Sequence, residues 1–251
     1  MGQPVVSVNP RTGDVTEVST QETDQAELDE RCAASEKSLA ALDELGPHGR
    51  AGLLRAMAAE LSSDETDLVA VADRESGLGL PRLTGELART SYQLRFFADV
   101  IEDGAYLELT IDHAGSTPAG PRPDLRRMLV PIGPVAVFEA SNFPLAFGVP
   151  GGDTASALAA GCPVVVKAHP AHPETAERCI NLLRAGARKA GVPDDVVQLV
   201  QGMHAGAALM LHPKIRAAAF TGSLRGGQAL SELAMRRPDP IPFYGEYGSV
   251  N

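Results

Sequence analysis

The segment PVVVKAHPAHPETAERCINLLRAGARKAG, residues 163–191, decides the fold class. It opens with an apolar run of strand length that ends at Lys167, and a helical stretch follows from Pro173 to Ala190. Gly191 then ends the helix. A fully apolar strand followed by a long helix is typical of a βαβ crossover, which joins two parallel strands of one sheet. The segment therefore predicts an α/β fold.

The rest of residues 132–251 repeats this alternation. Apolar runs predict strands over residues 135–138, 163–167, 196–200, 215–220 and 241–244. Helical patterns between them cover about 151–160, 173–190, 205–211 and 224–235. The expected architecture is a Rossmann-like parallel sheet with helices on both faces.

Residues 1–104 predict a helical N-terminal part. The amphipathic stretches lie at 25–45, which ends at Gly46-Pro47, and at 48–61 and 83–101. Ser62 and Glu65 have the spacing of a capping box, which predicts a further helix start.

Residues 105–131 predict a β-hairpin on the edge of the main body. Tyr106–Ile111 alternates apolar and polar residues, which favours a half-exposed strand. A loop rich in Gly and Pro joins it to a second strand at Arg127–Val130. An exposed edge of this kind normally pairs with another chain, so the hairpin predicts an oligomer.

Composition and charge exclude some classes of partner. The 251 residues include 22 Lys and Arg against 32 Asp and Glu, a formal net charge of −10. This charge argues against nucleic acid or an anionic membrane surface as the main partner. The longest uncharged stretch, Val196–Pro213, contains Gln, His and Gly and is not a membrane span. Three widely spaced cysteines, with no CxxC pair and no secretory signal, predict a reduced, cytoplasmic protein.

The ends of four predicted strands carry polar or glycine-rich turns. These turns are Glu139–Asn142, Lys167–His169, Gln201–Gly202 and Thr221–Ser223. Because ligands of parallel sheets bind outside the carboxyl ends of the strands, the sequence predicts a binding crevice at this edge.

The turn Thr221-Gly222-Ser223, with Gly226 in the helix that follows, is a candidate phosphate site. The GxGxxG and Walker motifs are both absent from the sequence. Glycines allow a ligand to approach the backbone, and a helix N-terminus beside the Ser223 hydroxyl would stabilise a phosphate. The alternative is that Ser223 only caps the helix. Lys167, at the end of a buried strand, either binds a ligand anion or extends its charge into solvent.

Asn142 and Glu246 are the candidates for chemistry. The Asn142 amide can donate to a developing oxyanion, although Asn-x-Pro also marks an ordinary turn. Glu246 lies among aromatic residues and glycines, which would raise the pKa of its carboxyl and suit it to general-base work, unless it simply faces solvent. His169 and His172 are disfavoured as metal ligands because Pro170 and Pro173 keep them off one helix face.

Five runs in this order resemble the aldehyde dehydrogenase superfamily over the whole chain. They are Pro134–Leu145, Gly161–Lys167, Gly191–Pro193, Phe220–Ser223 and Gly245–Asn251. The run from Ala140 to Lys167 and its continuation Ala168-His169-Pro170 are most similar to NADP-linked members that act on 2-oxoglutarate semialdehyde (2,5-dioxopentanoate). Tyr247-Gly248-Ser249-Val250 departs from the sequence that usually follows the family's glutamate.

The resemblance implies a role for each candidate. Asn142 would donate to the oxyanion of the intermediate, and Glu246 would activate the water that releases the acid. Lys167 would reach the adenosine ribose and its 2′-phosphate, and Ser223 with its helix would hold the pyrophosphate. Ser141, Thr221, Gly222 and Gly226 complete the cofactor-binding candidates. Pro170 stands where NAD-preferring members often carry an acid, so NADP is favoured and NAD is the alternative cofactor.

The implied reaction oxidises a small-molecule aldehyde to a carboxylic acid, with attack by a cysteine thiolate and hydride transfer to NAD(P). In the family that cysteine follows the glutamate, and Cys32, Cys162 and Cys179 do not match its position. We therefore expect the cofactor-binding part of a longer homo-oligomeric enzyme, inactive alone, with the catalytic domain largely absent. The alternatives are an acyl phosphate or acyl-CoA reductase fragment, which Glu246 disfavours, and a non-catalytic dinucleotide-binding module.

Overall fold

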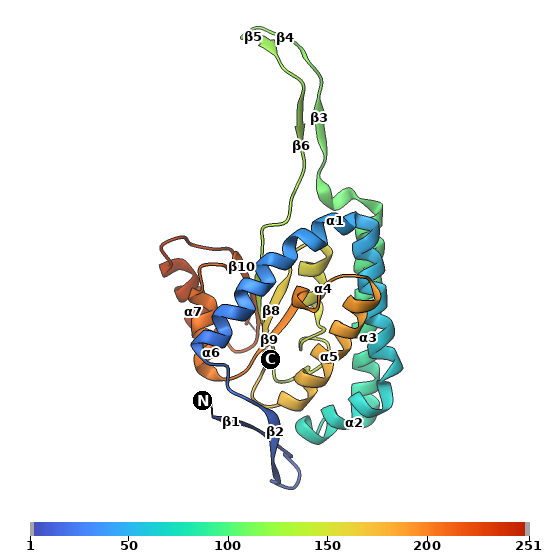
Figure 1. The fold of residues 1–251 in the computed structure, drawn as a ribbon, viewed down its shortest axis with the longest axis vertical. Helices are drawn as coiled ribbons and strands as arrows, with labels where there is room; N and C mark the ends of the chain where they lie inside the picture. Colours follow the sequence, from blue (N-terminus) through green and yellow to red (C-terminus); the bar gives the residue numbers. More distant parts are fainter. Residues whose placement is uncertain (1–2, 249–251) are drawn as a thin grey trace.

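The computed structural model describes residues 3–248, and a five-stranded parallel sheet lies at its centre (Figure 1). In chain order the strands are β7 (Val135–Phe138), β8 (Val164–Lys167), β9 (Val197–Val200), β10 (Ala217–Thr221) and β11 (Phe243–Glu246). Their spatial order is β11-β10-β7-β8-β9, and every neighbouring pair is parallel. The α/β class, the parallel sheet and its five strands are confirmed.

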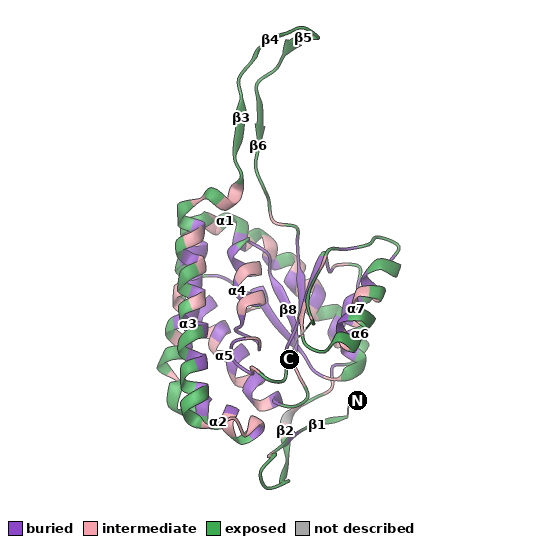
Figure 2. Ribbon diagram, turned by 180° about the vertical axis from the view of Figure 1, so that it is seen from behind, coloured by how far each residue is buried: buried purple, intermediate pink, exposed green. Residues whose placement is uncertain are grey.

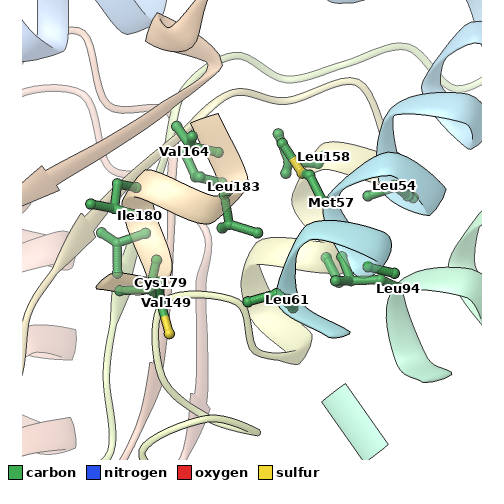
Figure 3. Close-up of a cluster of buried hydrophobic side chains, with 14 of the residues drawn as sticks. Leu54, Met57, Leu61, Leu94, Val149, Leu158, Val164, Cys179, Ile180 and Leu183 are labelled. Atoms are coloured by element: carbon green, nitrogen blue, oxygen red, sulfur yellow. The ribbon is translucent and has the colours of Figure 1, made fainter. Parts of the chain in front are cut away.

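Helices cover both faces of this sheet, also as predicted. On one face lie α4 (Gly152–Ala159) and α5 (Pro173–Lys189), and on the other lie α6 (Met203–Leu211) and α7 (Leu224–Arg236) (Figure 1). A 3₁₀ turn, η2 (Asp194–Val196), leads into β9. The larger core packs α4 and α5 between the sheet and the N-terminal helices, and Leu183, Ile180 and Leu158 lie within it (Figure 3).

Three helices form the N-terminal part: α1 (Gln25–Ser63), α2 (Glu65–Ser76) and α3 (Leu80–Asp103). The two helices expected on either side of Gly46-Pro47 are one helix interrupted by a kink, where Gly46 takes a φ of 61°. This positive φ suits glycine, and Pro47 can begin the second half because a helix start needs no N–H donor there. The predicted capping box was wrong, because Ser62 lies inside α1 and donates to Ser91 Oγ at 3.2 Å.

A hairpin of β1 (Pro4–Val8) and β2 (Val15–Gln21) precedes these helices and was not predicted. It is tied to the body through Glu75, whose Oε1 accepts hydrogen bonds from Ser7 Oγ at 2.7 Å and from the Glu174 N–H at 2.9 Å. The other oxygen, Oε2, accepts from the Thr175 N–H and hydroxyl, both at 2.7 Å. One buried carboxylate thus joins the hairpin, α2 and the first turn of α5.

A thin arm projects from the body between α3 and β7 (Figures 1 and 2). After η1 (Ala105–Leu107) it consists of two short antiparallel pairs: β3 (Thr110–Asp112) with β6 (Leu125–Arg127), and β4 (Gly115–Thr117) with β5 (Gly120–Arg122). A hairpin was predicted here, but the strand bounds were wrong. Tyr106 belongs to the 3₁₀ turn, residues 128–130 lie outside β6, and β3 and β6 are exposed on both faces rather than on one.

No helix within residues 3–248 combines the length and the apolar character that crossing a membrane requires.

Candidate functional site

A pocket of about 450 Å³ lies at the carboxyl ends of β7, β8 and β10. It brings together six of the residues predicted for the site: Ser141, Lys167, Thr221, Gly222, Ser223 and Gly226. Asn142 and Glu246 lie at the same edge of the sheet but do not line this pocket. The remaining wall is mostly apolar and includes Phe138, Pro170, Phe220 and Leu230. A pocket of this size and composition suits a flat organic group with an anionic end.

Lys167 places an ammonium group inside this pocket. The residue is 8% exposed, and its Nζ lies 4.0 Å from Met203 Sδ. Burial lowers the pKa of Lys167, while the charges of Glu139 and Glu22 partly oppose that shift. No ion pair joins Lys167 to a carboxylate in the described part of the chain. A buried, unneutralised cation of this kind favours an anionic ligand.

Ser223 begins α7 at the opposite side of the pocket. Its Oγ accepts a hydrogen bond from the Gly226 N–H at 3.2 Å, so the serine caps the helix. Capping leaves the hydroxyl proton available to a ligand, and α7 has no acidic residue in its first turn. The positive end of the α7 dipole therefore remains open to a phosphate.

Glycines are required in this turn because Phe220 lies against it. A Cβ atom at Gly222 would come within 2.7 Å of Phe220 Cζ, and one at Gly226 within 3.0 Å. The same turn is held to β11, because the Gly222 N–H donates to the Glu246 carbonyl at 3.1 Å. The backbone can consequently approach a ligand here without an intervening side chain.

A buried polar cluster in the wall of the pocket was not predicted. Glu139, which follows β7, is fully buried in its side chain, and its Oε2 accepts from the His169 N–H at 2.6 Å. His172 Nδ1 lies 3.8 Å from the same oxygen, and His172 Nε2 donates to the Ala140 carbonyl at 3.0 Å. Burial raises the pKa of Glu139, while its hydrogen bond from the His169 N–H and the charge of Lys167 partly oppose that shift. Burial likewise lowers the pKa of His169 to about 4, so that imidazole is neutral at pH 7.

Asn142 lies on an exposed turn that the N-terminal helices hold in place. Its carbonyl accepts a hydrogen bond from Arg82 Nη2 of α3 at 2.7 Å, and its side-chain amide makes no hydrogen bond with residues 3–248. Three and four residues after Asn142, the Leu145 and Ala146 N–H groups donate to the buried Glu86 carboxylate at 2.7 and 2.9 Å. The position of Asn142 therefore depends on α3 as well as on β7.

Glu246 ends β11 opposite Thr221 and is exposed. It lies close enough to Asp153, in the first turn of α4, to influence that group. The pKa of Asp153 is raised to about 6, first by burial and second by the charge of Glu246. Asp153 and Glu246 thus form a pair of neighbouring carboxyl groups at this edge of the sheet, of which Asp153 can exchange a proton near neutral pH.

Within residues 3–248 no three His, Cys, Asp or Glu side chains gather in a way that could hold a metal ion. The His169 and His172 rings do stack, with centroids 5.4 Å apart, although the sequence separated them by proline. All three cysteines are buried and free. None of them lines the pocket.

The sequence profile of the aldehyde dehydrogenase family matches residues 2–249. The chain belongs to the aldehyde dehydrogenase family. Among curated relatives in this family, alpha-ketoglutaric semialdehyde dehydrogenase 2 of Azospirillum brasilense is 47% identical over 90% of the chain and 44% of its own length. The alpha-ketoglutaric semialdehyde dehydrogenase of Acinetobacter baylyi is 43% identical over 90% of the chain and 43% of its own length. The chain therefore spans less than half the length of these two relatives.

Solved structures share the fold. An NADP-dependent enzyme of E. coli superposes with a TM-score of 0.85 at 27% identity, covering 98% of this chain and 48% of the other. An aldehyde dehydrogenase from Brucella melitensis biovar abortus 2308 superposes with a TM-score of 0.82 at 26% identity, over 99% of this chain and 50% of that one.

Glu86 and Glu139 were missed by the sequence analysis as parts of this candidate site. Glu139 was noted only as part of a polar turn, and Glu86 lies inside a helix that carried no visible chemistry. The sequence does contain one indication for Glu86: the helical periodicity of α3 places this acidic residue on the face of the helix that is buried.

Proposed function

We propose that the chain binds NADP, with NAD as the weaker alternative, and that it is the cofactor-binding part of an enzyme that oxidises an aldehyde to a carboxylic acid. The observation that carries the proposal is Lys167, a buried ammonium without a carboxylate partner in residues 3–248, facing the open N-terminus of α7 across one pocket. Family membership and the names of the two curated relatives support the reaction and favour 2-oxoglutarate semialdehyde as the aldehyde.

In this proposal the pocket holds the cofactor at two points. Lys167 binds the ribose and its 2′-phosphate, while Ser223 and the first N–H groups of α7 bind the pyrophosphate. Pro170 lines the same pocket, so no side-chain charge at that position repels a 2′-phosphate. Ser141, Thr221, Gly222 and Gly226 form the wall between these points.

Bound NADP supplies the acceptor for a hydride. Asn142 donates its side-chain amide to the carbonyl oxygen of the aldehyde, where negative charge develops. Glu246 holds and orients the water that releases the acid, and Asp153 beside it can take up the proton because its pKa is raised to about 6. Residues 1–104 and 132–251 build the cofactor-binding part, and 105–131 form the hairpin for a homo-oligomer.

Calorimetric titration with NADP and NAD tests the cofactor assignment. NADP should bind more tightly than NAD, and Lys167→Met should lower NADP affinity by about tenfold or more, since a charge-assisted contact is lost. The control is Lys189→Met, which removes an exposed lysine paired with Glu60. Tighter binding of NAD, or unchanged NADP affinity in Lys167→Met, contradicts the proposal.

The isolated chain should not oxidise aldehydes. A thiolate is the reactive form of cysteine, and burial raises the pKa of Cys32 to about 12 and that of Cys179 well above its usual value. Absorbance of NADPH measures the activity, and aldehyde-dependent NADPH formation that disappears in Cys162→Ala or Cys179→Ala would refute the assignment. A non-catalytic dinucleotide-binding module remains the second candidate, favoured by those same buried cysteines. The cytoplasmic location stays a prediction.

A further inference from the structure

One face of α3 carries two arginines next to the turn of Asn142. Arg82, Glu86 and Arg89 are spaced i, i+4 and i+7, so they share a face of the helix. Glu86 binds two backbone N–H groups of the segment 142–147, and this buried contact fixes the face against that segment. The two guanidinium groups therefore have a defined position relative to Asn142.

Each guanidinium is also supported by an aromatic ring. The Cζ atom of Arg82 lies 4.9 Å from the ring centre of Phe143, and that of Arg89 lies 5.3 Å from the ring centre of Phe147. The two rings contact each other edge to face, with centroids 5.5 Å apart. Stacking on a ring orients a guanidinium without using its N–H donors.

The two arginines differ in whether their N–H groups form hydrogen bonds within the chain. Arg82 donates to the Asn142 carbonyl, whereas Arg89 makes no hydrogen bond and no ion pair with any of residues 3–248. Arg55, in contrast, pairs with both Asp99 and Glu102, which lie near the C-terminal end of α3. The chain has a net charge of −10, so an unpaired positive charge is notable. Arg89 is exposed beside the proposed reaction site with all its N–H donors free of residues 3–248, which makes it a candidate ligand contact.

We propose that Arg89 binds the carboxylate of a short aldehyde that carries an acid group at its far end, with the aldehyde carbonyl held at Asn142. The inference rests on the proposed function and adds the residue that selects the substrate class. Seven residues of helix place Arg89 about 10 Å along α3 from Arg82, a separation that a short carbon chain and the arginine side chain can span together. Arg82, which bonds the Asn142 backbone, is a positioning residue.

Two unreactive amides test this assignment by calorimetry on the purified chain. Glutaramate (5-amino-5-oxopentanoate) presents an amide carbonyl to Asn142 and a carboxylate to Arg89, while pentanamide has the same amide and no carboxylate. Glutaramate should bind about tenfold more tightly than pentanamide, because a charge-assisted contact is gained. Arg89→Met should remove this difference and leave pentanamide binding unchanged.

Two further variants separate the roles. Arg95→Met removes an exposed guanidinium from the same helix and should keep the full preference for glutaramate. Arg82→Met should weaken both ligands by the same factor, because it acts through Asn142. Equal affinity for the two amides in the wild type, no detectable binding of glutaramate, or a preference that survives in Arg89→Met overturns the proposal.

The titrations are run with and without NADP. If NADP does not bind while the glutaramate preference depends on Arg89, the proposed function fails and the arginine assignment stands. If NADP binds as expected and the preference is absent, only the assignment of Arg89 is wrong.

Discussion

The pocket edge of the sheet and the projecting arm are built in opposite ways. At the pocket edge, side chains such as Glu139 and His172 are fully buried and joined to backbone groups from neighbouring elements. Along the arm the strands have three residues each and are exposed on both faces (Figure 2). The arm also exposes large apolar side chains: Leu109, Ile111, Leu125, Met128, Leu129 and Val130.

The difference shows which part of the molecule is stable by itself. The body buries its apolar side chains within one chain, whereas a short two-stranded ribbon with nothing packed against it is at best marginally stable in water. The apolar surface of the arm is available for contact with another polypeptide, as the oligomer prediction requires.

A Leu→Ala substitution should lower the free energy of unfolding much more in the core of the body than on the arm. Leu183→Ala, in the core between the sheet and α1, should lower the free energy of unfolding by about 3 kcal/mol, because it leaves a cavity (Figure 3). Leu129→Ala, at a residue 54% exposed on the arm, should change it by less than about 0.5 kcal/mol. Urea denaturation measures both. Similar losses at the two sites would mean that the arm packs against the body.

Asp153→Asn tests how strongly the pocket edge is desolvated. An Asp153 pKa of about 6 in the folded chain exceeds its ordinary value of 3.8, so this group stabilises the fold below about pH 4, and that contribution is lost as the pH rises through 6. Asp153→Asn should therefore raise stability by roughly 1–3 kcal/mol at pH 8 and by almost nothing at pH 4.

Denaturation at the two pH values checks this dependence. In Glu246→Gln the pKa of Asp153, followed by carbon NMR, should fall part of the way, because burial remains. A gain from Asp153→Asn that is equal at both pH values would contradict an ionisation effect.

Charges on the arm should have a smaller effect, on association rather than on folding. Leu129→Glu with Val130→Glu should weaken self-association by about tenfold, since apolar contact area is lost and like charges face each other. Light scattering over a concentration series measures this. Met235→Glu on α7 is the matched control, because Met235 is equally exposed but lies away from the arm. If the wild-type chain stays monomeric at every concentration, the prediction that the arm mediates self-association is wrong.

The sequence predicts the sheet well because its strands are short and mostly apolar. The run Val164-Val165-Val166 can only be a buried strand once a long helix follows it, and the strand-end rule then places Lys167 and Ser223 at one edge. The catalytic and cofactor-binding roles of these residues stay predictions.

Other features depend on contacts that no local pattern reveals. Arg82 reaches the Asn142 carbonyl, and Glu86 reaches the Leu145 N–H, only because α3 packs beside the segment that follows β7. Nothing in the spacing of residues 80–103 indicates which turn Arg82 would reach. The alternation at Tyr106–Ile111 was misleading for a related reason: period two indicates a strand, but it does not say whether either face is covered.

Glu75 makes the N-termini of α5 and α7 different as binding sites for an anionic ligand. Both α5 and α7 start at the carboxyl edge of the sheet, so each directs a partial positive charge there. The Glu75 carboxylate already occupies the first N–H groups of α5 and acts as a permanent internal counter-ion. At the N-terminus of α5 a phosphate would therefore compete with Glu75, whereas the first turn of α7 carries no acidic residue. In the proposed function, this difference directs the phosphate of the cofactor to α7 rather than to α5.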